Sequence, residues 1–168
     1  ILGADADLRL QAVSQYTGQP ETQGGLVKTL DFKIYLGLLT ETYNAAHQGD
    51  LKRTAAVPID MVIVNLYPFK QTIAQAGVSV EGARGQIDIG GPCMIRAAAK
   101  NFIRVAPVVD PSDYARIREE LAANEGQTTL ALRFSLAQKA FAHTADYDRA
   151  IADYLGGQTT AAAAACYR

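Results

Sequence analysis

The sequence lacks several features that would assign it to a common class of enzyme. Its two cysteines, Cys93 and Cys166, fit neither the spacing of a zinc site nor a disulfide framework. Its two histidines, His47 and His143, both fall in expected helices, so no Ser–His–Asp triad is indicated. The H-E-x-x-H, Walker and G-x-G-x-x-G motifs are also missing. The sequence therefore predicts neither a metal site nor a dinucleotide cofactor.

Charge and hydropathy narrow the choice of partner. The formal net charge is −1 over 168 residues, which predicts neither a nucleic acid nor an anionic membrane as partner. No apolar run approaches the ~20 residues that cross a bilayer. The opening residues I-L-G-A-D-A-D-L-R lack the basic start and apolar stretch of a signal peptide. We expect a soluble cytoplasmic protein. Because the chain begins with Ile1, we expect it to be processed, trimmed or partial.

Hydrophobic patterning predicts an α/β fold with a helical C-terminal third. The β-branched run Met61–Val64 is typical of a parallel strand buried on both faces, and Pro107 favours an edge or bulged position in a second strand. Strands are expected over 8–13, 59–66 and 103–109. Helices are expected over 34–47 and 113–123, and over 130–141 after a cap at Thr128 or Thr129. A separate helix is expected from a cap at Thr144 to an end at Gly156-Gly157. The alanine-rich tail 158–168 is predicted to be a linker or a fraying end.

The stretch from Gln86 to Asn101 combines a carboxylate, a glycine pair and a lysine. Asp88 precedes Gly90-Gly91-Pro92, and the alanine-rich run that ends at Lys100 is expected to be helical, with the proline at its first position. The free N–H groups of such a helix start can hold an anion or a polarised carbonyl. The residues alone also fit a plain helix entry with a solvated lysine.

Two further candidates lie near the ends of expected strands. Asn65 lies at the end of the 59–66 run and Tyr67 follows it, and ligands of open α/β sheets gather at the carboxyl ends of strands. Tyr67 equally fits a half-buried residue that closes the sheet end. Lys28 lies close to a glycine-rich turn. A lysine beside a carboxylate suits carbonyl addition followed by dehydration, which needs no metal.

Four motifs in these regions resemble a known family. They are G-G-x-V-K-T-L at 24–30, N-L-Y-P-F at 65–69, Q-I-D-I-G-G-P-x-M-I-R-A-A-A-K-N at 86–101 and K-A-F-x-H-T-A-x-Y-D at 139–148. Their order and spacing are similar to those of the IMP cyclohydrolase domain of the bifunctional AICAR transformylase/IMP cyclohydrolase family. The sixteen-residue match is the most specific of the four.

The resemblance implies a methylglyoxal-synthase-like parallel sheet with flanking helices. It also implies a reaction, the dehydrative closure of 5-formamidoimidazole-4-carboxamide ribotide (FAICAR) to IMP, the last step of de novo purine biosynthesis. No cofactor or metal is implied. Matched by motif, the catalytic residues are Lys28, Tyr67, Asp88 and Lys100. The residues matched to the substrate's base and carboxamide are Thr29, Asn65, Leu66, Ile89, Gly90 and Gly91.

The same resemblance suggests roles and partners. Lys100 is expected to polarise the formyl oxygen and protonate the departing hydroxyl, while Asp88 orients the carboxamide and takes its proton. Tyr67 and Lys28 are expected to position the reacting groups. Residues 1–157 are assigned to a partial cyclohydrolase-like domain, and 158–168 to a tail or interdomain linker. The expected partner is a second copy in a homodimer or a transformylase domain.

The sequence departs from the family pattern in three ways. The family's first strands, whose loops hold the substrate phosphate, have no counterpart, so we expect the sheet to lack them. Leu26 stands where the family has arginine, and Asp31-Phe32 replaces His-Pro, which adds negative charge near an anionic ligand. These departures leave a rival open: a non-catalytic cyclohydrolase-like scaffold or purine-nucleotide-binding module. A methylglyoxal-synthase-like enzyme would share only the fold.

Overall fold

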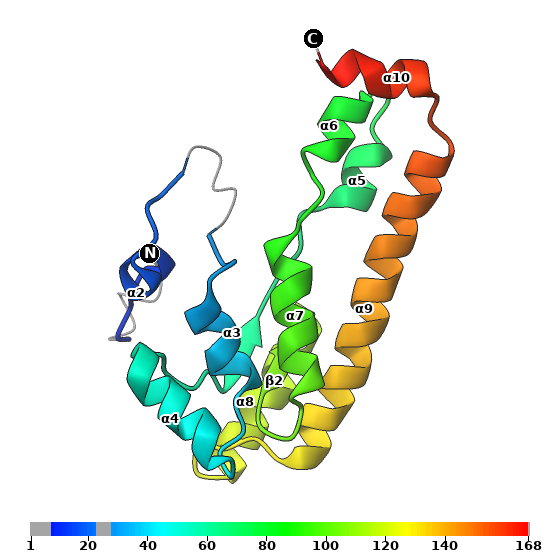
Figure 1. Cartoon of the computed structure of the whole chain (residues 1–168). Coiled ribbons are helices and arrows are strands. Elements are labelled where there is room, and N and C mark those ends of the chain that lie inside the picture. Colours follow the sequence, from blue (N-terminus) through cyan, green and yellow to red (C-terminus); the bar gives the residue numbers. More distant parts are fainter. Residues whose placement is uncertain (1–7, 23–27, 168) are drawn as a thin grey trace. The chain divides into compact units, whose positions relative to one another are not determined.

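The computed structural model describes residues 8–22 and 28–167 of the chain (Figure 1). The chain divides into two compact units, Ile1–Ile59 and Asp60–Arg168. Each unit is described by itself below. The domain boundary expected at residue 157 stays a prediction.

The first unit contains three described helices, α2 (Val13–Thr17), α3 (Phe32–Leu39) and α4 (Ala45–Thr54). The strand expected over 8–13 is wrong: residues 8–12 form no strand, and α2 begins at Val13. The single helix expected over 34–47 is two helices, because the backbone is extended at Thr40. Asn44 then starts α4, with its side chain accepting hydrogen bonds from the N–H groups of Ala46 and His47.

The second unit contains the sheet. Strands β1 (Met61–Ile63) and β2 (Ala106–Val108) are parallel, with Met61 opposite Ala106 and Ile63 opposite Val108. Both strands are shorter than the expected ranges, and the expected burial of β1 on both faces is wrong, because only Val62 of its three residues is buried and Ile63 is exposed. Among the described residues the sheet has two strands, so each is an edge strand. The edge position predicted for Pro107 is confirmed; as a proline it has no N–H to give to a further strand.

Helices make up most of the second unit. In chain order they are α5 (Phe69–Ile73), α6 (Val80–Arg84), α7 (Gly90–Lys100), the 3₁₀ turn η2 (Pro111–Asp113), α8 (Tyr114–Ala123), α9 (Leu130–Gly156), α10 (Thr160–Ala164) and the 3₁₀ turn η3 (Ala165–Tyr167). The helical C-terminal third is therefore confirmed. The tail expected to be a linker or fraying end contains α10, which packs against α6.

The break expected at Thr144 is wrong, because α9 is one continuous helix of 27 residues. Thr144 is fully buried in the middle of α9, and its hydroxyl donates to the carbonyl of Phe141 in the same helix. A threonine in a helix interior commonly satisfies its hydroxyl in this way. The helix does begin at one of the two expected caps, Thr129, whose Oγ1 accepts from Leu132 N–H at 3.2 Å.

The core of the second unit lies where α7 meets α9 and the sheet (Figure 1). Its buried members are Ile95, Ala99, Val109, Ala137 and Ala140. Three of the five are alanines, and small side chains let two helices approach closely. Helix α7 starts beside the segment that follows β1, and its far end leads through residues 101–105 into the start of β2. It therefore runs antiparallel to both strands. Its amino end therefore lies at the carboxyl edge of the sheet.

Candidate functional site

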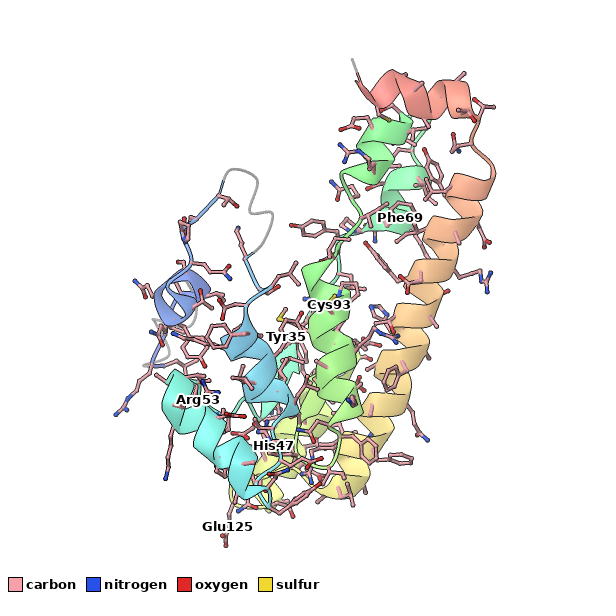
Figure 2. All side chains as sticks on the ribbon, viewed as in Figure 1. Tyr35, His47, Arg53, Phe69, Cys93 and Glu125 are labelled. Atoms are coloured by element: carbon pink, nitrogen blue, oxygen red, sulfur yellow. The ribbon has the colours of Figure 1, made fainter. Side chains whose placement is uncertain are left out.

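The segment that follows β1 forms the first part of the candidate site. Tyr67 is 52% exposed, while Phe69, two residues on, is 1% exposed. Phe69 N–H donates to the Tyr67 carbonyl at 2.8 Å, which forms a tight turn around Pro68. Phe69 is labelled at the start of α5 in Figure 2. Its ring packs edge-on against Tyr147 and Tyr154 of α9, with centroid distances of 6.2 and 5.8 Å. The buried phenylalanine thus anchors the exposed tyrosine at the sheet edge.

The Asp88 carboxylate forms the second part. Its Oδ1 accepts from Gly91 N–H at 2.8 Å, which satisfies one of the free donors at the start of α7. A Cβ on Gly91 would lie 2.7 Å from both Asp88 Oδ2 and Leu66 Cδ2, so a larger residue there would have to displace these two side chains. The side chains of Leu66 and Asp88 therefore both lie close to Gly91. Within the described residues, Asp88 Oδ2 has no hydrogen-bond partner.

Tyr147 of α9 holds the loop that carries Asp88. Its hydroxyl accepts from Asp88 N–H at 2.8 Å and donates to the Gln86 carbonyl at 3.0 Å. Burial raises the pKa of the Tyr147 phenol, and the negative charges of Asp88 and Asp148 raise it further, against a lowering by the bond from Asp88 N–H. The phenol is therefore neutral at physiological pH and able to donate.

The start of α7 differs in detail from the expectation. The helix begins at Gly90 rather than at Pro92, which is its third residue. The residue before the helix, Ile89, is 59% exposed, and its carbonyl accepts from Cys93 N–H at 3.3 Å. Ile89 and Gly90 therefore border the Asp88 loop, as residues of a ligand site at this edge would.

A cavity of about 260 Å³ opens beside Tyr67. It is bounded on one side by the strand-exit segment and on the other by α9. Its lining residues are Asn65, Leu66, Tyr67, Pro68, Phe69, Lys70, Gln71, Val109, His143, Asp146 and Tyr147. Lys70 and Asp146 form an ion pair at 2.5 Å at this cavity. The lining of the cavity includes three of the residues predicted for the site, Asn65, Leu66 and Tyr67.

Lys100 lies far from these residues within one chain. It is the last residue of α7 and is exposed to solvent. At 1.5 Å per residue, the eleven residues of α7 separate its two ends by about 16 Å. Asn65, Leu66, Tyr67, Asp88 and Gly91 come together at the carboxyl edge of the sheet, whereas Lys100 lies toward the opposite edge.

Lys28 and Thr29 belong to the first unit, where they line a cavity of about 250 Å³ with Ser14, Gln19 and Glu21. Lys28 is exposed and Thr29 is half-buried. Leu26, predicted to replace a phosphate-binding arginine, lies outside the described residues.

Asp31 has a structural role in the first unit. It is 7% exposed, its Oδ1 accepts from Lys33 N–H at 2.8 Å to cap α3, and its Oδ2 accepts from Gln19 Nε2 at 2.7 Å. Both oxygens are therefore engaged within the fold. The negative charge introduced by this departure from the family pattern is satisfied by local donors.

Sequence reasoning missed Tyr147 as a residue of the site. Its helical spacing with Ile151 and Tyr154 indicated an aromatic core stripe, and its ring does pack in a core cluster with Phe69 and Ala83. The one signal that pointed further is its place in the K-A-F-x-H-T-A-x-Y-D motif at 139–148. The contact of its hydroxyl with residues 86 and 88 joins positions about sixty apart in the chain and follows no local pattern.

The described residues also give two negative findings. No three His, Cys, Asp or Glu side chains among them gather closely enough to hold a metal ion. In the same part of the chain, every helix is too short or too polar to cross a membrane.

Comparison with known proteins gives two family matches. Residues 2–93 match the MGS-like domain, and residues 98–167 match the AICARFT/IMPCHase bienzyme. The chain is 48% identical over 151 residues to the bifunctional purine biosynthesis protein PurH of Magnetococcus marinus, and 50% identical over 150 residues to that of a Cyanothece species. These matches cover 90% and 89% of the chain but 28% and 29% of the relatives, so the chain spans less than a third of their length.

A solved structure shares the fold. The crystal structure of ForH superposes with a TM-score of 0.75 at 31% sequence identity, over 90% of this chain and 78% of ForH. Together with the MGS-like match, this confirms the fold class expected from the sequence.

Proposed function

The chain belongs to the AICARFT/IMPCHase bienzyme family, and we propose that it forms the ring-closing part of an IMP cyclohydrolase site. The substrate is FAICAR, and the products are IMP and water. The observation that carries the proposal is the environment of the Asp88 carboxylate at the start of α7. One of its oxygens is held by Gly91 N–H, and the other is without a partner among the described residues, beside the segment of Asn65 and Tyr67.

The chemistry needs a base and a donor. In ring closure the carboxamide nitrogen attacks the formyl carbon, the two substrate nitrogens each lose one proton, and the formyl oxygen leaves as water. Asp88 Oδ2 takes the carboxamide proton, and a lysine polarises the formyl oxygen and protonates the departing hydroxyl. Tyr67 and Lys28 position the reacting groups. Since the reaction is intramolecular, holding a near-attack geometry supplies much of the rate.

The base and carboxamide of the substrate need a surface of neutral donors and acceptors. The residues assigned to it are Thr29, Asn65, Leu66, Ile89, Gly90 and Gly91. The last five adjoin Asp88 or Tyr67 in sequence, at the carboxyl edge of the sheet. That edge is where ligands of open α/β sheets bind.

Lys100 requires a different arrangement, because about 16 Å of helix separates it from Asp88 in one copy. We propose that Lys100 of a second copy completes the site in a homodimer. The exposed face of α7 supports this arrangement: Ile89, Cys93, Arg96 and Lys100 are all exposed and recur at helical spacing. Antiparallel packing of two such faces about a two-fold axis brings each Lys100 beside the other copy's Ile89.

The first test measures FAICAR cyclisation. The proteins are this chain alone and a chimaera in which it replaces the matched segment of the M. marinus relative. The chimaera is expected to form IMP, and Asp88→Asn is expected to reduce kcat on the order of a hundredfold. Glu119→Gln, an exposed acid on α8, is the control and is expected to have no effect. A folded chimaera that binds IMP without turnover would support the rival, a purine-nucleotide-binding module.

The second test asks whether two copies share the site. Asp88→Asn and Lys100→Ala chimaeras are each expected to be nearly inactive. Unfolded and refolded together in equal amounts, they are expected to recover about a quarter of wild-type activity, because half of the dimers are mixed and each mixed dimer has one intact site. No recovery from a mixture that forms dimers would contradict a shared site. Normal activity of Lys100→Ala alone would remove Lys100 from the mechanism.

A further inference from the structure

We propose that Tyr147 is a positioning residue that holds both Asp88 and Tyr67 in place for ring closure. It acts from α9, outside the loops that carry those residues. The inference rests on the proposed function for its kinetic consequence and on the hydrogen bonds of the loop for its structural one.

The hydroxyl of Tyr147 fixes the backbone on which Asp88 is carried. A phenol has one hydrogen to donate, and here the Asp88 N–H bond occupies the oxygen as acceptor, so its own hydrogen goes to the Gln86 carbonyl. The two bonds fix the peptide groups that enter Asp88. Tyr147 is only 7% exposed, so water has little access to compete for them.

The ring of the same residue reaches the second loop. It packs edge-on against Phe69, whose N–H holds the Tyr67 carbonyl at 2.8 Å. Ile87, from the Asp88 loop, packs against the same cluster. One side chain of α9 therefore contacts the segments that carry the proposed base and the proposed positioning tyrosine.

This arrangement predicts a specific kinetic signature. The hydroxyl of Tyr147 is occupied by backbone groups and makes no bond to the substrate. Removal of this hydroxyl is therefore expected to leave substrate binding unchanged. Loss of its hydroxyl frees the Asp88 loop to leave the reactive geometry. The reaction is sensitive to such displacement, since an error of about 1 Å costs on the order of a hundredfold in rate. The effect therefore falls on kcat rather than on KM.

The test compares two tyrosines of α9. Tyr147→Phe and Tyr154→Phe each remove one hydroxyl and keep a ring against Phe69, but among the described residues the Tyr154 hydroxyl has no hydrogen bond. In the chimaera, Tyr147→Phe is expected to lower kcat about tenfold with KM changed less than about twofold. Tyr154→Phe is expected to match wild type. Equal kcat in Tyr147→Phe and wild type would overturn the proposal.

A coupled variant separates positioning from general damage to the fold. If Tyr147 acts through Asp88, adding Tyr147→Phe to Asp88→Asn is expected to lower kcat much less than it does alone. Full additivity of the two changes would indicate that Tyr147 acts elsewhere.

A readout without turnover keeps the two proposals distinguishable. In this chain, amide hydrogen exchange at Asp88 is expected to be about tenfold faster in Tyr147→Phe than in wild type, with exchange at Ala140 in the core of α9 unchanged. Unchanged exchange at Asp88 would overturn the positioning role. If the wild-type chimaera closes no ring while exchange responds as expected, the proposed function fails and the loop anchor stands.

Discussion

At its amino end α7 starts beneath the Asp88 carboxylate, whereas at its carboxyl end Lys100 extends into solvent. The first end is held by Gly91 N–H, by the Tyr147 hydroxyl and by Leu66 packed against Gly91. For the Lys100 side chain itself, the structure describes no ion pair or hydrogen bond within residues 8–22 and 28–167. An ordered carboxylate suits a base that must act in one fixed geometry. The exposed lysine is the residue that the proposed homodimer would contribute to the site of the other copy.

The largest effect is expected from a substitution at the amino end of α7, where Asp88 is held. Gly91→Ala places a Cβ 2.7 Å from Asp88 Oδ2 and Leu66 Cδ2, and such overpacking costs about 1–3 kcal/mol of unfolding free energy. Displacement of Asp88 is expected to lower cyclisation on the order of a hundredfold. Urea unfolding and the FAICAR assay measure the two effects.

The control for this change is Gly156→Ala. Gly156 is the last residue of α9, and a Cβ there has no neighbour within 4 Å. Its replacement is expected to leave stability unchanged or to raise it by up to about 1 kcal/mol. A Gly91→Ala protein as stable and active as wild type would contradict the close packing at the start of α7.

A smaller effect on stability is expected from substitutions that compare the two ends of α7. Asp88→Ala removes the acceptor for Gly91 N–H and is expected to lower the unfolding free energy by about 1 kcal/mol. Lys100→Ala, at the exposed end, is expected to change it by less than about 0.5 kcal/mol. Thermal or urea unfolding of both variants checks the difference. Equal losses would mean that Lys100 is bound into the fold.

The smallest effect on stability is expected at Asp110. This residue is a second carboxylate at the same edge of the sheet, and it can be compared with Asp88. The two oxygens of Asp110 are both engaged, one by Ser112 N–H at 2.8 Å and the other by Lys139 at 2.7 Å. The Lys139 ammonium, with help from Ser112, holds the pKa of the Asp110 carboxyl well below its usual range. Asp110 thus closes a turn, whereas Asp88 Oδ2 has no hydrogen-bond partner among the described residues.

The pH dependence follows from this lowered pKa. A carboxyl whose pKa is lowered by folding stabilises the folded state above its ordinary pKa, and the stabilisation is lost as pH falls below about 4. Urea unfolding is therefore expected to show wild type more stable than Asp110→Asn at neutral pH, with the gap closing in acid. A gap that stays constant down to pH 2 would mean that Asp110 is not charged in the folded state.

Several elements were predictable because their signals are local. The Thr129 cap and the apolar spacing after it predict where α9 begins, and the M-V-I-V run predicts β1. Pro107 predicts an edge position because a proline lacks the N–H of the ladder. The Asp88-to-Lys100 stretch predicts a glycine-opened helix. In each case the residue type and its nearest neighbours decide the outcome.

Other elements depend on packing. Thr144 looks like a cap by type, yet its full burial inside α9 and the bond to Phe141 keep the helix continuous. Residues 34–47 have helical spacing, yet the chain leaves the helix at Thr40 and starts another after Asn44. The alanine-rich tail looks unstructured by composition, yet α10 finds a surface on α6. Burial and long-range contact override local preference in all three.

For the candidate site, the sequence predicts the chemical groups and the family, because a motif records residue types and their spacing. It determined Asp88, Tyr67 and Lys100 as candidates and the MGS-like fold that carries them. The folded chain, and no local motif, brings Asp88 and Leu66 together at Gly91 and places Tyr147 in contact with both of their loops. It also decided that a rigid helix keeps Lys100 away from Asp88 within one copy, because distance along a helix is set by its rise and not by the likeness of a motif.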